Sequence, residues 1–333
     1  MRRYYREAVD AVCAAESVVI ASHVNPDGDS LGCTLGLAHA LRALNKDLVA
    51  ISTDGVPDIY RFLPGAEWIQ TSTERRDFDL AIVVDAGALE RAGRSQREML
   101  LSAPTLLNID HHVGDAPFGD IRIVDPEAAA TAELIYGLVR ALGSRFGRDL
   151  MTGAIADCLM TGVITDTGSF RFMNVTPQTF WLAARLQRLG AMPAEIAELV
   201  FENRSFASLK LLGCALESLQ TTPDGRVAWA VVTAADYARF GAQDAETEGI
   251  VNHVRAVRGA AIGVLFREVP GGKVRISLRA REGADVNRIA NVFGGGGHRL
   301  AAGCSIEPPL GDAVDRVVAE CARQLGTPPA GAP

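Results

Sequence analysis

The sequence predicts an α/β protein with a parallel sheet in its N-terminal domain and a smaller α/β domain at its C-terminus. Apolar, β-branched runs alternate with helical stretches in the first half, at residues 17–23, 79–85 and 105–110. Strands that alternate with helices favour right-handed βαβ crossovers and hence a parallel sheet. After Gln220 the pattern changes to short apolar runs separated by turns such as Pro223-Asp224-Gly225, which is typical of hairpins.

The apolar periodicity assigns the individual elements of both halves. In the first half we expect four strands and five helices: strands at 17–23, 46–53, 79–85 and 105–110, and helices at 30–44, 128–142, 150–164, 177–189 and 193–201. In the second half we expect a hairpin, a short helix and a last strand: 261–267 with 273–279, then 285–293 and 301–306. The expected domains are residues 1–195, a helical linker at 196–220, a second domain at 221–326 and a disordered tail at 327–333.

Composition indicates a globular cytoplasmic protein. Of the 333 residues, 48% are hydrophobic and 22% are charged, and no apolar run approaches the roughly 20 residues that a membrane helix needs. The N-terminal residues lack the apolar core of a signal peptide. Six scattered cysteines without a C-x-x-C pair indicate free thiols in a reducing compartment.

The charge distribution favours a short anionic partner over a long nucleic acid. The net charge of −7 argues against a basic coat for a long strand. Residues 253–299, however, hold nine Lys or Arg against three acids, so this segment carries +6 and the remainder −13. A basic surface of this kind suits a short anion, although an ordinary solvated helix face is the alternative explanation.

Acidic and imidazole side chains follow the predicted strands. They form four clusters, followed by a glycine run far downstream: His23-x-x-x-Asp27-x-Asp29, then Asp85, then Asp110-His111-His112, then Asp166. Strands that end in such residues present them at the sheet edge where open α/β folds gather their chemistry. Oxygen-rich ligation with few imidazoles and no thiolate favours two manganese or magnesium ions. Two ions need a shared carboxylate, for which Asp85 is the candidate; the alternative is that Asp27-Gly28-Asp29 is an ordinary turn with helix caps.

The histidines divide into two groups. His111 and His112 are adjacent at a strand end, so we expect one to bind metal and the other to face the substrate, with Asp110 orienting a ring. His39 lies in an apolar helical stretch and His253 in a basic one, and we expect packing or surface roles for both.

These clusters resemble the four motifs of the DHH phosphoesterase superfamily. The downstream glycines, with His298 and Ala301-Ala302-Gly303, resemble that superfamily's associated substrate-binding domain, and His-x-Asn-Pro-Asp-Gly-Asp-Ser is similar to the nano-RNase branch. Cys33 and Ala280 depart from the family pattern, in which serine is common at both positions. The resemblance implies hydrolysis of short oligonucleotides (nanoRNA and linear dinucleotides such as pApA or pGpG) to mononucleotides, and removal of the 3′-phosphate of pAp, by a hydroxide that two cations activate.

The resemblance also implies a role for each site residue. His23, Asp27 and Asp85 would hold one metal, and Asp29, Asp85, His111 and Asp166 the other, with manganese favoured over magnesium. His112 would contact the scissile phosphate and Asp110 would support it. The substrate-binding residues would be Ser277 and Arg279 as a Ser-x-Arg element, with Gly295, Gly296, Gly297 and His298. Four glycines in a row can also form a backbone anion nest, although many such runs are only loops.

Three rival functions share parts of this pattern. A long-strand DNA exonuclease of the RecJ type would need a more basic chain and an additional nucleic-acid-binding domain. An inorganic pyrophosphatase would have a different C-terminal domain, and a non-catalytic nucleotide-binding module would have lost some of the ligand positions, all of which are filled here. The residues leave open the direction of degradation, the RNA or DNA preference, and whether the chain forms a homodimer.

Overall fold

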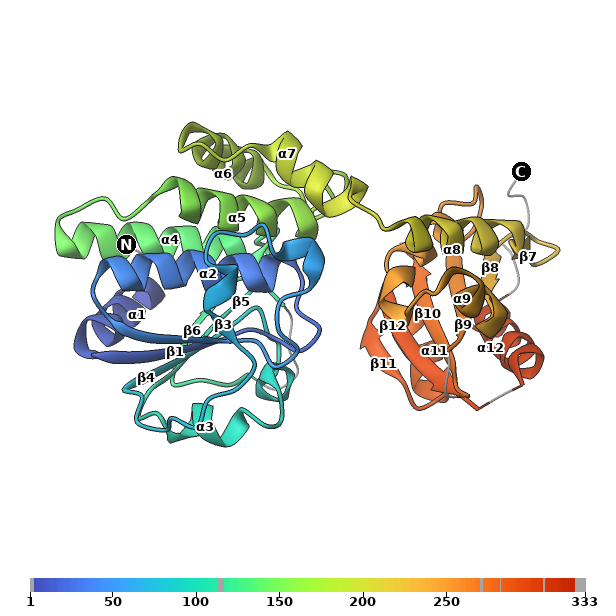
Figure 1. Ribbon diagram of the computed structural model, residues 1–333, viewed down its shortest axis with the longest axis horizontal. Helices are drawn as coiled ribbons and strands as arrows, with labels where there is room; N and C mark the ends of the chain where they lie inside the picture. The colour runs from blue at the N-terminus through green and yellow to red at the C-terminus, as the bar shows by residue number, and fades with distance from the viewer. Residues whose placement is uncertain (1–2, 113–116, 270–271, 282, 308, 327–333) are drawn as a thin grey trace. The chain divides into compact units, whose positions relative to one another are not determined.

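The computed structural model describes residues 3–112, 117–269, 272–281, 283–307 and 309–326. The chain divides between Asn203 and Arg204 into two compact units (Figure 1). The expected tail at 327–333 lies outside the described residues. None of the helices within the described ranges combines the length and the apolar character needed to span a bilayer.

The first unit is built on a six-stranded sheet in which every pair of neighbours is parallel, as predicted. The strand order is β3-β2-β1-β4-β5-β6. The strands are β1 (Ser17–Ala21), β2 (Asp47–Ile51), β3 (Ile69–Gln70), β4 (Leu80–Val84), β5 (Leu106–Asp110) and β6 (Ile121–Val124). The order reverses between β1 and β4, which makes that gap the topological switch point where doubly wound sheets bind their ligands.

Helices cover both faces of this sheet (Figure 1). One face forms the larger hydrophobic core with a layer of long helices, and the opposite face packs against α3 (Arg97–Ser102). The remaining helices of the unit are α1 (Arg3–Ala14), α2 (Gly28–Ala43), α4 (Thr131–Phe146), α5 (Gly153–Asp166), α6 (Pro177–Arg188) and α7 (Pro193–Ala197), and α7 continues into a π-helical turn at Glu198–Glu202. Strands β1, β4 and β5 are buried along their whole length, which explains their continuous apolar runs.

Close packing of α2 on α5 sets the position of the later ligands. Gly28, Gly32 and Gly36 recur every four residues and so lie on one face of α2. A Cβ atom at Gly32 would lie 2.2 Å from the carbonyl oxygen of Cys158, so a larger residue would force the two helices apart. The glycines therefore allow backbone contact between the helix that carries Asp29 and the helix that ends at Asp166.

The second unit holds a mixed sheet with the order β11-β12-β10-β9-β8-β7. Its strands are β7 (Gln220–Thr221), β8 (Val227–Val232), β9 (Ile262–Glu268), β10 (Val274–Ala280), β11 (Gly296–His298) and β12 (Ala301–Ile306). The predicted hairpins β7–β8 and β9–β10 are confirmed by antiparallel pairing, whereas β8 and β9 pair in parallel. The helices are α8 (Phe206–Glu217), α9 (Ala234–Phe240), α10 (Ile250–Arg255), α11 (Val286–Val292) and α12 (Leu310–Leu325).

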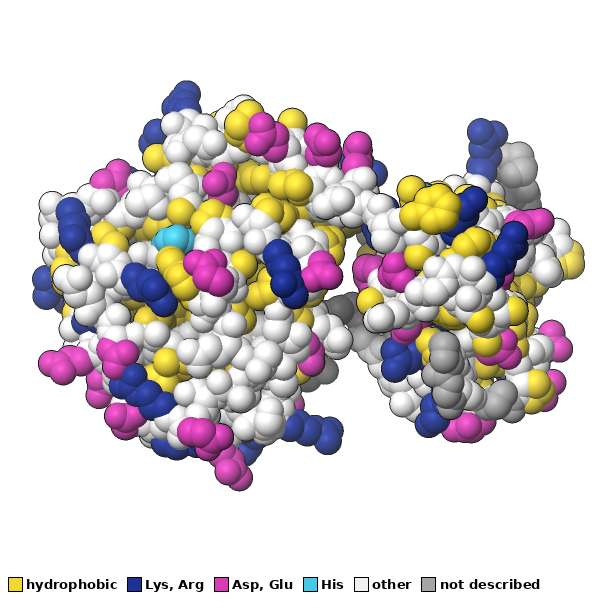
Figure 2. Space-filling view, viewed as in Figure 1, with side chains coloured by type: hydrophobic (Ala, Val, Ile, Leu, Met, Phe, Trp, Pro, Cys, Tyr) yellow, Lys and Arg dark blue, Asp and Glu magenta, His cyan; other side chains and the backbone are white. Residues whose placement is uncertain are grey.

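Helix α8 differs from the expected linker at 196–220. Its Leu211 and Ala215 are buried against β8 and α10 in the core of the second unit, so the helix is part of that unit. Its outer face is also apolar, and Figure 2 shows hydrophobic side chains gathered over it, among them the exposed Phe206 and Leu209. A helix that is apolar on both faces has a weak amphipathic pattern, and this explains why the periodicity did not assign it to a domain.

Candidate metal centre

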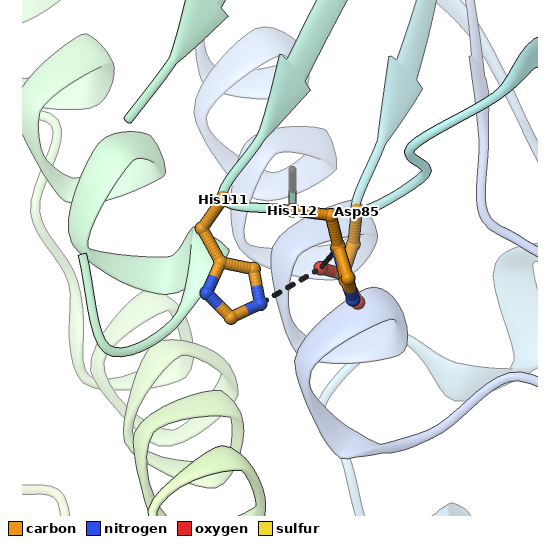
Figure 3. A group of neighbouring side chains, drawn as sticks. All are labelled: Asp85, His111 and His112. Carbon is orange, nitrogen blue, oxygen red and sulfur yellow. Dashed lines mark ion pairs between the residues drawn. The ribbon is translucent and has the colours of Figure 1, made fainter. Parts of the chain in front are cut away.

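The acidic and imidazole residues of the first unit meet at the carboxyl edge of the sheet, around its switch point. His23 follows β1, Asp85 follows β4, and Asp110, His111 and His112 lie at the end of β5. Because β1, β4 and β5 are adjacent and parallel, their ends deliver these side chains to one place. Figure 3 shows the ring of His111 directed toward Asp85, with His112 overlapping Asp85 in this view.

His23, Asp27 and Asp85 form the first group of potential ligands. The Nε2 atom of His23 lies 3.5 Å from Oδ2 of Asp85 and 3.7 Å from Oδ2 of Asp27. Its other ring nitrogen, Nδ1, donates a hydrogen bond to the carbonyl of Val24 (2.8 Å). This hydrogen bond fixes the tautomer, so Nε2 is the atom available to a cation.

Asp27 also has a structural role, which combines the two interpretations of the Asp27-Gly28-Asp29 turn. It is the N-cap of α2, and its Oδ1 accepts hydrogen bonds from the backbone N–H groups of Asp29 (3.1 Å) and Ser30 (3.0 Å). The other carboxylate oxygen faces His23. One side chain therefore caps the helix and still offers an oxygen to the centre.

Asp85 is at the middle of the cluster. Its Oδ1 lies 3.7 Å from Nε2 of His111 and 3.6 Å from Nδ1 of His112, while Oδ2 faces His23. The side chain is buried, and the backbone has φ +58°, a left-handed conformation that Asp tolerates better than most residues. Both oxygens of one buried carboxylate thus face imidazoles from two different strands, as a bridging ligand would require.

The rings of the two adjacent histidines both approach Asp85. Their ring centroids are 4.6 Å apart at an interplanar angle of 72°. His111 donates from Nδ1 to the carbonyl of Ala128 (3.0 Å), which leaves Nε2 for a cation. His112 donates from Nδ1 to Oδ1 of Asp110 (2.7 Å), so Asp110 orients a ring as expected.

Asp29 and Asp166 complete the cluster from the helices. Asp29 is fully buried in the first turn of α2, and Asp166 ends α5 with its Oδ2 3.0 Å from Nε2 of His111. Asp29 accepts backbone hydrogen bonds from Thr131 (2.6 Å) and Ala132 (3.1 Å), the first two residues of α4. The N-terminus of a helix stabilises a carboxylate, so the N–H groups of α4 partly offset the cost of burying Asp29 near the other candidate ligands.

Thr131 is a member of the centre that the sequence analysis missed. Its hydroxyl donates to Oδ1 of Asp85 (2.8 Å), while its backbone N–H donates to Asp29. One fully buried residue therefore holds two of the candidate ligands. A threonine at a helix start carries no signal of such a role, because the contact depends on residues 46 and 102 positions away.

The electrostatics of the cluster indicate a need for positive charge. Burial, with the neighbouring charges of Asp166 and Asp85, raises the pKa of Asp29 well above its usual value, and burial raises the pKa of Asp166 to about 6. Although burial alone would lower it, contact with Asp27 and Asp85 raises the pKa of His23 to about 10. Burial also opposes a charge on His111, yet contact with Asp166 raises its pKa to about 10. As long as no cation is bound, protons on Asp29, His23 and His111 therefore offset part of the negative charge of the cluster.

The donor set fits divalent cations. Among the residues that the structure describes, three groups have ligand atoms within 4.8 Å of one another: His23 with Asp27 and Asp85, Asp29 with His111 and Asp166, and Asp85 with His111 and His112. The groups share Asp85 and His111, so two neighbouring ions could be held. Oxygen and imidazole donors without thiolate suit magnesium, manganese or zinc, and a cation would replace the protons on Nε2 of His23 and His111.

Ser277 and Arg279, the candidate substrate residues of the second unit, lie on one face of β10. Burial lowers the pKa of Arg279, and the positive charges of Arg255 and Arg267 lower it further while Glu248 opposes them. Ser277 accepts a hydrogen bond from Nη2 of Arg267 (3.0 Å), a residue that the sequence did not single out as a substrate contact. Arg255 and Arg267 thus lie close enough to the two candidate residues to act on them electrostatically or by hydrogen bonding.

The glycine run differs from the expected anion nest. The N–H groups of Gly294 and Gly295 donate to carbonyls at the end of α11 (3.1 and 2.9 Å), and Gly296 and Gly297 pair with β12 in strand β11. A Cβ atom at Gly295 would lie 2.2 Å from the carbonyl oxygen of Gly303. Glycine is therefore required here for close packing. His298 ends β11, and its side chain lies outside the described part of the structure.

A doubly wound α/β domain with a carboxylate- and imidazole-lined centre at its switch point is the architecture of a cation-dependent hydrolase. The DHH family N-terminal domain matches residues 17–163, and the DHHA1 domain matches residues 225–326. The chain therefore belongs to the DHH family, as its motifs predicted.

Relatives match the chain over nearly its full length. It is 34% identical to the bifunctional oligoribonuclease and PAP phosphatase NrnA of Thermus thermophilus, over 92% of this chain and 90% of the relative. The enzyme of the same name from Bacillus subtilis is 28% identical over 94% and 96% of the two chains. An exopolyphosphatase-related protein from Bacteroides fragilis has a TM-score of 0.90 at 26% identity, and the match covers 98% of each chain. RecJ of Thermus thermophilus in complex with Mn²⁺ (TM-score 0.60, 17% identity, 96% of this chain and 55% of RecJ) shares the fold.

Proposed function

We propose that this chain hydrolyses short oligonucleotides, including nanoRNA and linear dinucleotides such as pApA and pGpG, to mononucleotides and removes the 3′-phosphate of pAp. The observation that carries the proposal is the full-length similarity, through both domains, to relatives named for these two activities. The centre supports it, because its potential ligand groups share residues in the way that a two-cation site requires. The substrate is thus a short nucleotide, and a homodimer is one of the assemblies compatible with the chain.

In this proposal two divalent cations, preferentially manganese with magnesium as the alternative, occupy the centre. His23, Asp27 and Asp85 hold one, and Asp29, His111, Asp166 and the shared Asp85 hold the other. Cations at such a site lower the pKa of water and withdraw charge from a phosphoryl group. The N–H groups of α4 hold the Asp29 carboxylate in place, and the Nδ1 hydrogen bonds of His23 and His111 leave Nε2 directed to the cations.

His112 contacts the scissile phosphate and protonates the leaving oxygen. Burial lowers its pKa, but the hydrogen bond to Asp110 and the charge of Asp85 outweigh this effect and raise it. A ring that retains its proton near neutral pH can donate it from Nε2 while Asp110 holds Nδ1. His112→Ala should therefore reduce kcat more than it changes KM.

Ser277, Arg279 and His298 bind the remainder of the substrate, beside the edge strand that contains Gly296 and Gly297. Arg279 supports this role because the positive charges of Arg255 and Arg267 act on it, beside the negative charge of Glu248. Arg267 positions the Ser277 hydroxyl. Arg279→Ala should raise KM for pApA and for pAp, and an unchanged KM would contradict the assignment.

A length series tests the proposed function directly. 5′-labelled RNA and DNA oligomers from two nucleotides to about 25, with pAp alongside, are incubated in Mn²⁺ and in Mg²⁺. We expect turnover of pAp and of oligomers of a few nucleotides, with Asp85→Asn as the inactive control. Preferential degradation of long single-stranded DNA would favour a RecJ-like exonuclease, and binding without hydrolysis would favour a nucleotide-binding module.

A further inference from the structure

The chain leaves Asp166 through a left-handed turn. Gly168, Ser169 and Phe170 have φ angles of +54°, +60° and +62°. Glycine adopts such angles readily, but a bulky residue such as phenylalanine rarely does. Strained backbone of this kind persists only where the surroundings hold it, and it is concentrated at functional sites.

Specific contacts hold the turn. The N–H of Ser169 donates to the carbonyl of Ile164 (2.8 Å), and the N–H of Phe170 donates to the Thr167 hydroxyl (3.0 Å). The ring of Phe170 stacks on Phe180 of α6, with centroids 5.5 Å apart and an interplanar angle of 15°. The turn is therefore a defined structure with Phe170 as its anchor.

The next two side chains, Phe172 and Met173, form an exposed ledge. They are 46% and 91% exposed, although both are large and apolar. The Phe172 ring covers Gly168: a Cβ atom there would lie 2.4 Å from the ring, so glycine, which also favours the positive φ angle, lets the ring pack against the turn. The strained turn thus supports the ring from below and leaves its outer face to solvent.

Asn174 ties the ledge to the metal centre on two sides. Its Nδ2 donates to the carbonyl of Asp166 (3.1 Å) and to that of Ala129 (2.9 Å). Asp166 is a candidate ligand, and the carbonyl of Ala128, the neighbour of Ala129, accepts the hydrogen bond that Nδ1 of His111 donates. The ledge is therefore bonded directly to the backbone of Asp166, and through Ala129 it lies one residue from the carbonyl of Ala128 that holds His111.

We propose that Phe172 and Met173 stack against a nucleobase adjacent to the phosphate that is hydrolysed. This inference rests on the proposed function and identifies the part of the substrate that lies beside the centre. A phenylalanine face and a polarisable thioether both bind the flat surface of a base, and such stacking is tolerant of base identity. A ledge of this kind would serve pAp and short oligonucleotides alike, because each has a base close to the scissile phosphate.

A cycle of variants and substrates tests the proposal. KM and kcat in Mn²⁺ are measured for the wild type, Phe172→Ala, Met173→Ala and the double variant, on pApA and on two analogues that each lack one base. We expect the double variant to raise KM for pApA by about 5- to 150-fold, the range for loss of one base stack. For the analogue that lacks the base stacked on the ledge, KM should be the same in the wild type and in the double variant. Phe172→Tyr should retain the wild-type KM, since it keeps the ring.

The matched control is Phe146→Ala. Phe146 is also exposed, at 40%, but it ends α4, whose first residue contacts the centre. The helix places it roughly 22 Å away, and its removal should leave KM unchanged.

The outcomes separate this inference from the proposed function. If the wild type does not hydrolyse pApA, the proposed function fails. If the wild type is active and the double variant has an unchanged KM, the ledge does not bind a base. An equal rise in KM for pApA and for both analogues would also overturn the inference. Should the double variant be unfolded by circular dichroism, Met173→Ala decides alone, because this side chain is almost fully exposed.

Discussion

Replacing Thr131 by valine should weaken cation binding without disturbing the fold. Valine has nearly the same shape and the same β-branched preference at the first turn of α4, and the backbone N–H that holds Asp29 remains. Only the hydroxyl that donates to Asp85 at 2.8 Å is lost. A hydrogen bond to a charged group contributes about 1.5–3 kcal/mol, and loss of an outer partner of a metal ligand typically costs about 10–100-fold in affinity.

The expected result is a rise of about 10-fold or more in the Mn²⁺ concentration that gives half-maximal activity. Isothermal titration calorimetry of the metal-free protein measures the same change without turnover. Thr131→Ser keeps the hydroxyl and should bind Mn²⁺ like the wild type. Equal affinity of Thr131→Val and the wild type, or equal weakening by valine and serine, would refute the role assigned to this hydroxyl.

Three further predictions concern the ligands themselves. Asp85→Asn, which retains the tolerance for φ +58°, should cut Mn²⁺-dependent turnover by more than the roughly 10–100-fold expected for an outer partner, with unchanged circular dichroism; turnover near the wild-type level would contradict the bridging role. Gly162→Ala should weaken Mn²⁺ binding, because a Cβ atom there would lie 2.3 Å from Oδ1 of Asp29. Gly153→Ala on the same helix is the control: its Cβ atom meets nothing closer than 3.4 Å, so Mn²⁺ binding should not change. Equal Mn²⁺ affinities of the two variants would contradict the packing argument. The stability of the metal-free protein, measured in urea titrations, should fall as the pH rises from about 6.5 to 10. The reason is the raised pKa of His23, whose charged form is a stabilising partner of Asp27 and Asp85 and is lost across this range. If a His23→Gln variant has the same pH dependence, another group is responsible.

The sequence predicted the strand ends that carry the candidate ligands because the signal there is local. Each of β1, β4 and β5 is an apolar run buried on both faces, and a polar residue directly after such a run marks the edge of the sheet. The superfamily resemblance then related the separate clusters to one centre. Short or half-exposed strands such as β3 and β6 lack this contrast, and no periodicity identified them.

The features that the sequence did not predict depend on contacts between distant residues. Thr131 became recognisable only when α4 was seen to point its first turn at Asp29 and Asp85. The N–H groups of Gly294 and Gly295 could have bound an anion, but the end of α11 uses them. Helix α8 could have been a linker, but Leu211 and Ala215 bury it in the second unit. In each case tertiary packing chose between alternatives that were locally equivalent.

The central claim is that the strand ends and helix termini of the first unit hold two neighbouring divalent cations through a shared Asp85. Electron paramagnetic resonance of metal-free protein titrated with Mn²⁺ tests it most directly. The account predicts two bound ions per chain whose spins couple, as expected for ions about 3.5–4 Å apart, and loss of that coupling in Asp85→Asn. A single bound ion, or two uncoupled ions unaffected by Asp85→Asn, would contradict it.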